Sequence, residues 1–331
     1  MVKRLFINYM IMIIKDLKTF SHILKENMKN KNILIVSHVN PDPDTLGSQI
    51  ALWHIVKKLN KKGQIHLYNR DIKQEKALIK FLPTIEKITN FPRYSFYDLI
   101  IALEPSNFER LGLKEISFNK LLIIDHHPSF NYDSFKQFNC YIYLDTHADA
   151  CSSIIYKLAK IYNIELNFEF KKAVLIGILA DTLFLRYATN KETFKIIYEL
   201  FDEDIKIREI YRILFSFETK DKRIIHKAIS KIKFYKDKKT AILDLSNFKI
   251  EKSKKGIFYE FLRFFKDIDV YIFIVKEKNK YEFHLRSDIF DVSELAKKFK
   301  GGGHKNAAAF SIFADKEKII KEILDQIKWR D

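Results

Sequence analysis

The sequence predicts a doubly wound α/β domain with a mainly parallel sheet, joined by a helical linker to a smaller α/β domain. Short apolar runs bounded by polar turns recur in the first part of the chain, and they are rich in isoleucine and leucine, as in strands buried on both faces of a parallel sheet. These runs occupy residues 33–36, 65–68, 99–103 and 121–124. Helical patterns such as residues 46–59 lie between them and give βαβ alternation.

The pattern changes after residue 150, and this change predicts the domain organisation. Helical periodicities occupy residues 152–162, 170–179, 192–200 and 204–214, a lysine-rich stretch follows, and strands resume at 240–245, 270–275 and 281–285. A chain of 331 residues is long enough for two cores. We therefore expect a first domain at 1–219, a helical linker at 220–239 and a smaller domain at 240–331. Residues 1–30 would be an N-terminal extension or the first strand or helix of the core.

Composition restricts the classes of partner and compartment. The formal net charge of +17 attracts polyanions, although a general lysine bias with a solvated basic surface explains it equally well. Only two cysteines occur, Cys140 and Cys151, which excludes a disulfide framework or a thiolate zinc site and favours the reducing cytoplasm. The apolar stretch at 9–14 is far shorter than the ~20 residues that span a bilayer, so no stable membrane association is expected.

Acidic and imidazole side chains follow the first predicted strand. His38, Asp42 and Asp44 lie where this buried strand ends and a helix begins, and ligands of parallel sheets bind at the carboxyl ends of strands. An aspartate N-cap with a Pro-Asp turn would explain Asp44 alone, but not the whole His-x3-Asp-x-Asp pattern. We expect Asp42 and Asp44 to face two different ions, with His38 on the first.

A second polar group, Asp125-His126-His127, directly follows the strand predicted at 121–124. An acid and two imidazoles are costly to bury together unless a ligand satisfies them. A polar surface loop is the simpler interpretation of an isolated histidine pair. The recurrence of polar side chains directly after a buried strand favours a site.

Two further acids complete the set. Glu104 follows the strand predicted at 99–103, and Asp181 closes the apolar helix predicted at 174–180. Carboxylates with imidazoles make an oxygen-rich site that suits manganese. Two divalent ions sharing a carboxylate can stabilise the attacking and leaving oxygens of a displacement at phosphorus, so the sequence predicts metal-assisted phosphoester hydrolysis.

A third candidate site lies near the C-terminus. Gly302 and Gly303 belong to a run of three glycines that precedes His304, and backbone N–H groups of such a run can approach an anion. A helix C-cap and turn is the alternative interpretation. Arg286, at the end of a predicted strand, is a candidate phosphate ligand because a guanidinium binds phosphate bidentately, and a surface arginine is its alternative.

In their order along the chain, these motifs resemble those of the DHH phosphoesterase family, in particular its nanoRNases and 3′-phosphoadenosine 5′-phosphate phosphatases. The resemblance runs from about residue 33 to residue 313. The glycine run and Arg286 resemble the DHH-associated C-terminal domain, which in relatives binds the nucleotide portion of the substrate.

The resemblance implies a role for each site residue. His38 and Asp42 would hold one metal ion, Asp44, His126 and Asp181 the other, and Glu104 would bridge both. As catalytic residues beside His126, His127 would contact the scissile phosphate and Asp125 would orient the imidazoles. The substrate would bind in a cleft between the domains, held by Arg286, Gly302, Gly303 and His304. The family also implies a possible homodimer.

Two positions depart from the pattern of the family. The bridging position is usually aspartate, whereas Glu104 is one methylene longer and bridges two ions only if the backbone retreats slightly. Ala309 stands where relatives often have glycine, which is a milder departure.

The leading hypothesis for function is a manganese-dependent hydrolase that degrades short oligoribonucleotides to mononucleotides, with possible activity on 3′-phosphoadenosine 5′-phosphate. A second enzyme hypothesis is a cyclic di-adenylate or linear dinucleotide phosphodiesterase. A third, motivated by Glu104, is a nucleotide-binding regulatory protein with an impaired metal centre.

Overall fold

The chain forms two compact units that divide between Leu214 and Phe215. The computed structural model describes residues 11–73, 76–113, 115–248, 252–313 and 315–327. Within these ranges, no helix is both long and apolar enough to cross a membrane.

The first unit is built on a seven-stranded sheet in the order β1-β7-β6-β5-β2-β3-β4, in which every pair of neighbours is parallel. Its strands are β1 (Ile11–Ile14), β2 (Ile33–Ser37), β3 (Ile65–Tyr68), β4 (Ile88–Thr89), β5 (Phe96–Leu103), β6 (Ser117–Asp125) and β7 (Cys140–Leu144). The predicted parallel α/β sheet is therefore confirmed.

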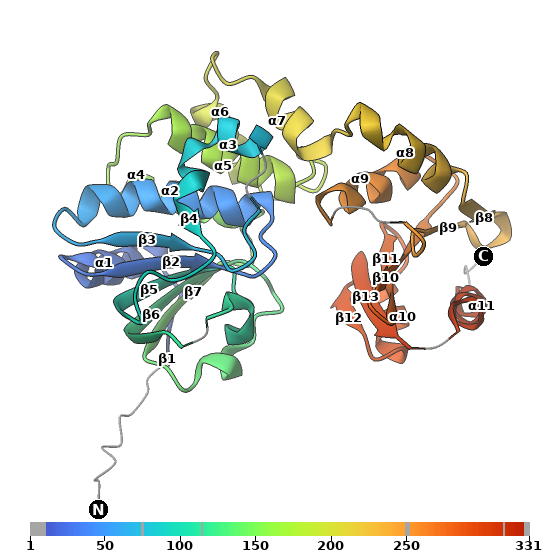
Figure 1. Ribbon diagram of the computed structural model, residues 1–331, viewed down its shortest axis with the longest axis horizontal. Helices are drawn as coiled ribbons and strands as arrows, with labels where there is room; N and C mark the ends of the chain where they lie inside the picture. The colour runs from blue at the N-terminus through green and yellow to red at the C-terminus, as the bar shows by residue number, and fades with distance from the viewer. Residues whose placement is uncertain (1–10, 74–75, 114, 249–251, 314, 328–331) are drawn as a thin grey trace, which may run out of the picture. The chain divides into compact units, whose positions relative to one another are not determined.

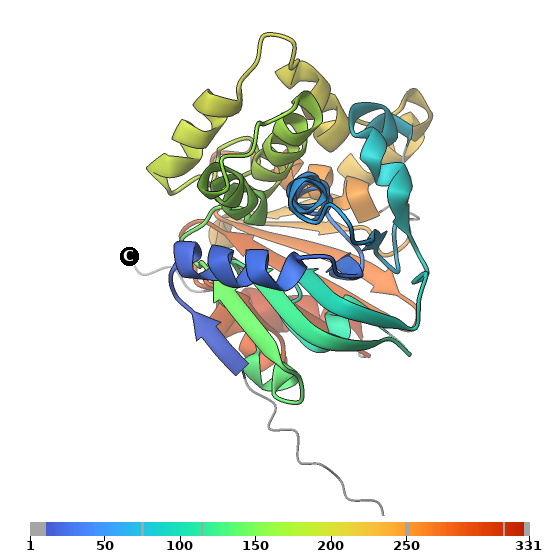
Figure 2. The same cartoon turned by 90° about the vertical axis from the view of Figure 1, so that its left-hand side faces the viewer.

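Helices cover one face of this sheet, as Figures 1 and 2 show. The helices of the unit are α1 (Leu17–Met28), α2 (Pro43–Leu59), α3 (Lys76–Phe81), α4 (Cys151–Ile161), α5 (Phe168–Asp181), α6 (Lys191–Leu200) and α7 (Ile207–Phe215). The apolar sides of α1, α2, α4 and α5 share one core with alternate residues of the strands. Short 3-10 segments, η2 (Phe108–Leu111) and η3 (Tyr132–Phe135), cover part of the other face. Burial on both faces explains the unbroken apolar runs of the central strands.

The second unit contains a six-stranded mixed sheet in the order β12-β13-β11-β10-β9-β8. Its strands are β8 (Ile232–Tyr235), β9 (Thr240–Asp244), β10 (Val270–Glu277), β11 (Lys280–Ser287), β12 (Gly302–His304) and β13 (Ala307–Ile312), and only the β9–β10 pair is parallel. Helices α8 (Lys222–Ile229) and α9 (Lys252–Leu262) pack on one face, and α10 (Val292–Lys298) and α11 (Lys316–Gln326) on the other. The predicted smaller α/β domain is confirmed.

The N-terminal segment follows one of its two expected alternatives, whereas the expected linker differs in part. Of the N-terminal residues 1–30, β1 joins the edge of the sheet beside β7 and α1 packs on its face, while residues 1–10 lie outside the described ranges. The expected linker at 220–239 is helical only in its first part, because β8 pairs antiparallel with β9 as the edge strand of the second sheet. An exposed lysine within this edge strand, Lys233, and lysines on either side of it obscure the apolar pattern of a strand.

Candidate metal centre

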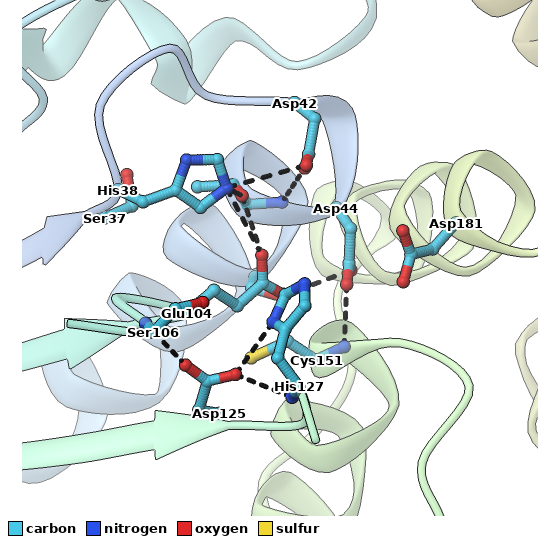
Figure 3. Close-up of polar contacts among 12 residues, drawn as sticks. Ser37, His38, Asp42, Asp44, Glu104, Ser106, Asp125, His127, Cys151 and Asp181 are labelled. Carbon is cyan, nitrogen blue, oxygen red and sulfur yellow. Dashed lines mark hydrogen bonds and ion pairs between the residues drawn. The ribbon is translucent and has the colours of Figure 1, made fainter. Parts of the chain in front are cut away.

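The register of three neighbouring strands brings predicted site residues to one edge of the first sheet. His38 directly follows β2, Glu104 directly follows β5, and Asp125 is the last residue of β6. These three strands are neighbours in the sheet and pair in parallel. Their side chains therefore meet at the carboxyl end of the sheet, as Figure 3 shows.

Two helices bring further carboxylates to the same edge. Asp42 is the N-cap of α2 and Asp44 lies in its first turn, while Asp181 is the last residue of α5. The two helices approach closely at Gly47 and Gly177: an added Cβ on Gly47 would lie 2.2 Å from a backbone oxygen of α5, and one on Gly177 would lie 2.4 Å from Asp44 Oδ1. Glycine at both positions lets the start of α2 meet the end of α5.

The carboxylates and imidazoles form two groups of possible metal ligands. The first comprises His38, Asp42 and Glu104, and the second comprises Asp44, His126 and Asp181, with one ligand atom per residue lying within 4.8 Å of the others in its group. Glu104 lies between the groups: its Oε2 is 3.8 Å from His38 Nε2 and its Oε1 is 3.9 Å from His126 Nε2. The structure thus brings together all six residues expected to bind metal.

Backbone carbonyls orient both imidazoles. His38 Nδ1 lies 2.9 Å from the carbonyl oxygen of Val39, and His126 Nδ1 lies 3.0 Å from that of Ala148. Since a carbonyl only accepts, the Nδ1–H of His126 donates, and in the neutral ring this leaves the Nε2 lone pair facing the carboxylates. Fixing the tautomer in this way is typical of histidines that ligate metal.

Asp44 is anchored by the first turn of α4. Its Oδ2 accepts a hydrogen bond of 2.7 Å from the backbone N–H of Cys151, and its Oδ1 accepts one of 3.0 Å from that of Ser152. These N–H groups have no partner within the helix, and the partial positive charge of a helix N-terminus favours an anion. The carboxylate is therefore held on a rigid support.

Asp125 belongs to neither ligand group and instead supports the histidines. It is fully buried and accepts hydrogen bonds from the backbone N–H groups of Ser106, His126 and His127 and from His127 Nδ1, all between 2.7 and 2.9 Å. Burial alone would raise the pKa of Asp125, but the hydrogen bonds from His127 and Ser106 hold it below its ordinary value. His127, whose side chain is 37% exposed, consequently turns Nε2 away from Asp125.

The centre carries more carboxylates than its own groups can neutralise. Glu104 is buried, its Oε1 has no hydrogen-bond partner, and burial together with the charges of Asp44 and Asp42 raises its pKa well above the ordinary value. Desolvation and the charge of Asp44 also raise the pKa of Asp181 to about 8, although 34% of its side-chain surface is exposed. An orphaned buried oxygen among carboxylates and imidazoles fits divalent cations.

The predicted substrate-binding residues lie in the second unit, on the two strands β11 and β12 that flank β13. Arg286 in β11 is paired with β13, and Gly303 in β12 pairs with the same strand. Gly303 has φ +140°, and a Cβ there would lie 2.4 Å from a backbone oxygen of β13, so strand pairing alone requires this glycine. Gly302 faces open space, and the side chain of His304 lies outside what the structure describes.

Several functional contacts escaped the sequence analysis. The hydroxyl of Thr45 lies 2.7 Å from both Glu104 Oε2 and His38 Nε2. The supporting groups of Cys151, Ser152 and Ala148 belong to the backbone and carry no side-chain signal. The one available signal was the threonine at position 45, whose hydroxyl directly follows the predicted ligand Asp44.

The fold and the site define a class: a two-unit α/β protein with a carboxylate and imidazole centre at the strand ends of its first unit. Residues 32–178 match the model of the DHH family, N-terminal domain, and residues 211–329 match that of the DHHA1 domain. These matches cover most of both units, and the chain belongs to the DHH family.

The chain is similar to known proteins over nearly the whole length of each. The chain is 26% identical to the probable bifunctional oligoribonuclease and PAP phosphatase NrnA of Streptococcus mutans, over 93% of this chain and 99% of the relative. It is also 26% identical to the bifunctional oligoribonuclease and PAP phosphatase NrnA of Bacillus subtilis, over 88% and 95%. An exopolyphosphatase-related protein from Bacteroides fragilis has a similar fold, with a TM-score of 0.78 at 22% identity, over 93% of this chain and 96% of that one.

Proposed function

We propose that this protein is a metal-dependent phosphoric ester hydrolase that degrades short oligoribonucleotides to mononucleotides and dephosphorylates 3′-phosphoadenosine 5′-phosphate. The observation that carries the proposal is the position of Glu104 between two groups of possible metal ligands. The full-length similarity to relatives named as oligoribonucleases and PAP phosphatases supports the choice of substrates.

The donor set supports two divalent cations, and we propose manganese. His38 and Asp42 would hold one ion, Asp44, His126 and Asp181 the other, and Glu104 both. Oxygen donors combined with imidazole suit manganese better than a site of thiolates would. When bound, such a pair of ions supplies Lewis acidity toward a phosphate group and lowers the pKa of water into the neutral range.

The remaining groups of the chain orient the substrate. Asp125 accepts the Nδ1–H of His127, so Nε2 points away from Asp125, and in the imidazolium form, in which both nitrogens donate, Nε2–H would bind a non-bridging oxygen of the scissile phosphate. Arg286, Gly302, Gly303 and His304 would bind the rest of the nucleotide. The formal net charge of +17 favours the approach of such polyanions.

A single comparative assay tests the proposal. Purified full-length protein with Mn²⁺ is given diribonucleotides to pentaribonucleotides, 3′-phosphoadenosine 5′-phosphate, and a cyclic dinucleotide, and released mononucleotide or phosphate is measured. We expect turnover of the short oligoribonucleotides and of 3′-phosphoadenosine 5′-phosphate. Substituting Asp125→Ala or His126→Ala should abolish it.

Asp133→Ala is the matched control. Asp133 is an exposed carboxylate of the same unit that pairs with Lys136, so its loss should leave turnover unchanged. Turnover of the cyclic dinucleotide alone would favour the second enzyme hypothesis. Nucleotide binding with no turnover of any substrate would favour a regulatory protein.

We also propose that the protein works in the cytoplasm. Cys140 and Cys151 are both buried and free, which agrees with a reducing compartment.

A further inference from the structure

The hydroxyl of Thr45 connects both sides of the first ligand group. Thr45 lies in the first turn of α2 and is fully buried, and its Oγ1 donates a hydrogen bond of 2.7 Å to Glu104 Oε2. The same oxygen lies 2.7 Å from His38 Nε2. The backbone N–H of Thr45 donates to Asp42 Oδ1 at 2.9 Å, so the residue itself is fixed by the helix cap.

This contact makes the two oxygens of Glu104 unequal. Oε2 is tied to Thr45 beside His38, whereas Oε1 has no hydrogen-bond partner and faces His126 Nε2 at 3.9 Å. A glutamate has one more rotatable bond than an aspartate, so its carboxylate is less well fixed unless another group restrains it. Thr45 provides that restraint.

The backbone at Glu104 has an uncommon conformation. Glu104 has φ +53° and Ser106 has φ +50°, both in the left-handed region that side chains other than glycine seldom adopt. Hydrogen bonds hold the segment there: the N–H of Glu104 donates to Ile124 O, and that of Ser106 to Asp125 Oδ2. The longer side chain therefore starts from a fixed backbone and ends on a fixed hydroxyl.

We propose that Thr45 is a positioning residue that lets a glutamate serve at the bridging position. Its hydroxyl orients the carboxylate so that Oε2 faces the group of His38 and Oε1 faces the group of His126. The inference rests on the proposed function, because it assumes that both groups bind divalent ions.

Manganese binding to the metal-free full-length protein tests this role directly. Isothermal titration calorimetry with Mn²⁺ alone should give two bound ions for the wild type. Thr45→Val, which keeps the shape but lacks the hydroxyl, should weaken binding of at least one ion roughly 10–100-fold, as for other residues that orient metal ligands. Thr45→Ser, which keeps the hydroxyl, should restore affinity to within about threefold. If Thr45→Val does not fold, as judged by circular dichroism, Thr45→Ala replaces it.

A double-mutant cycle separates positioning from a general structural effect. In the Glu104→Asp background the shorter carboxylate no longer reaches Thr45, so adding Thr45→Val should change manganese affinity less than threefold. Equal losses in both backgrounds, or wild-type binding by Thr45→Val, would overturn the role of Thr45. A wild type that binds no manganese would overturn the proposed function instead.

Discussion

The carboxylates gathered at the sheet edge of the first unit differ from two ion-paired aspartates of the second unit in the charges that surround them. In the second unit Asp244 is paired with Lys316, and Asp288 with Arg263, so negative charge meets a cation. In the first unit Asp44, Glu104 and Asp181 gather at one edge of the sheet, and the pKa values of Glu104 and Asp181 are raised. The difference teaches that the repelling carboxylates of the first unit cost stability as long as no cation is bound, and the proposed metal ions would remove this cost.

The largest expected effect comes from removing one of these carboxylates, which changes both turnover and stability. Asp181→Asn should lower turnover about a thousandfold, because losing a metal ligand removes several kcal/mol of transition-state stabilisation. The same change should stabilise the chelator-treated protein by on the order of 1 kcal/mol, a value kept small because solvent screens a partly exposed carboxylate. Release of mononucleotide from short oligoribonucleotides measures the loss of turnover, and thermal unfolding of the chelator-treated protein measures the gain in stability.

The control for this substitution is Asp133→Asn, which removes an exposed carboxylate of the same unit. It should change the free energy of unfolding by less than about 0.5 kcal/mol. If Asp181→Asn destabilised the metal-free protein, the carboxylates would not be repelling one another.

Overpacking the centre should have the next largest effect. A methyl group in Gly177→Ala would lie 2.4 Å from both Asp44 Oδ1 and Ser152 Oγ, so Asp44 must move from the N-terminus of α4. We expect a loss of about 1–3 kcal/mol of stability and weaker manganese binding. Gly302→Ala, where the new methyl group meets no atom within 4 Å, should leave the melting temperature unchanged.

Removing a paired carboxylate of the second unit should act in the opposite direction to Asp181→Asn. Asp244→Asn breaks the pair with Lys316, whose side chain is only 16% exposed, and should destabilise the protein by about 1 kcal/mol. Glu294→Gln, which breaks an exposed pair with Lys297, should be neutral within error in urea unfolding. A stabilising Asp244→Asn would remove the contrast between the units.

The dependence of stability on pH should separate the two kinds of carboxylate by smaller amounts. Because the pKa of Asp181 is raised to about 8, ionising it costs the metal-free fold stability, and the advantage of Asp181→Asn should grow as pH rises from about 5 to 8. Burial would raise the pKa of Asp244, but Lys316 and Ser246 hold it below its ordinary value.

The stability that Asp244 contributes is therefore complete at neutral pH and is lost only as pH falls through its lowered pKa. Between pH 5 and 8 the deficit of Asp244→Asn should stay constant. Urea unfolding of the three proteins at several pH values checks both trends, and parallel curves for the two variants would contradict them.

Much of the centre was predictable because the ends of buried strands can be recognised in a sequence. An apolar run that ends within two residues of His38, Glu104 or Asp125 marks the carboxyl edge of a buried parallel strand, and aligned strands bring such residues together. The order of the motifs then indicated the family. The edge strand β8 was missed because it is only four residues long, contains Lys233 and is flanked by further lysines.

The supports of the centre were not predictable in the same way. Asp44 is held by backbone N–H groups and His126 by the carbonyl oxygen of Ala148, and any residue type supplies such groups. Gly177 lies within an apolar helix where nothing in the sequence signals its contact with Asp44. Positions of this kind depend on how helices pack, which the periodicity of a single helix does not specify.

The most direct test of two cation sites that share Glu104 is anomalous diffraction at the manganese edge, from crystals of the full-length protein grown with Mn²⁺. We predict two peaks, one among His38, Asp42 and Glu104 and one among Asp44, His126 and Asp181, with the Glu104 carboxylate between them. A single peak that excludes Glu104, or no peak at this edge of the sheet, would contradict the account.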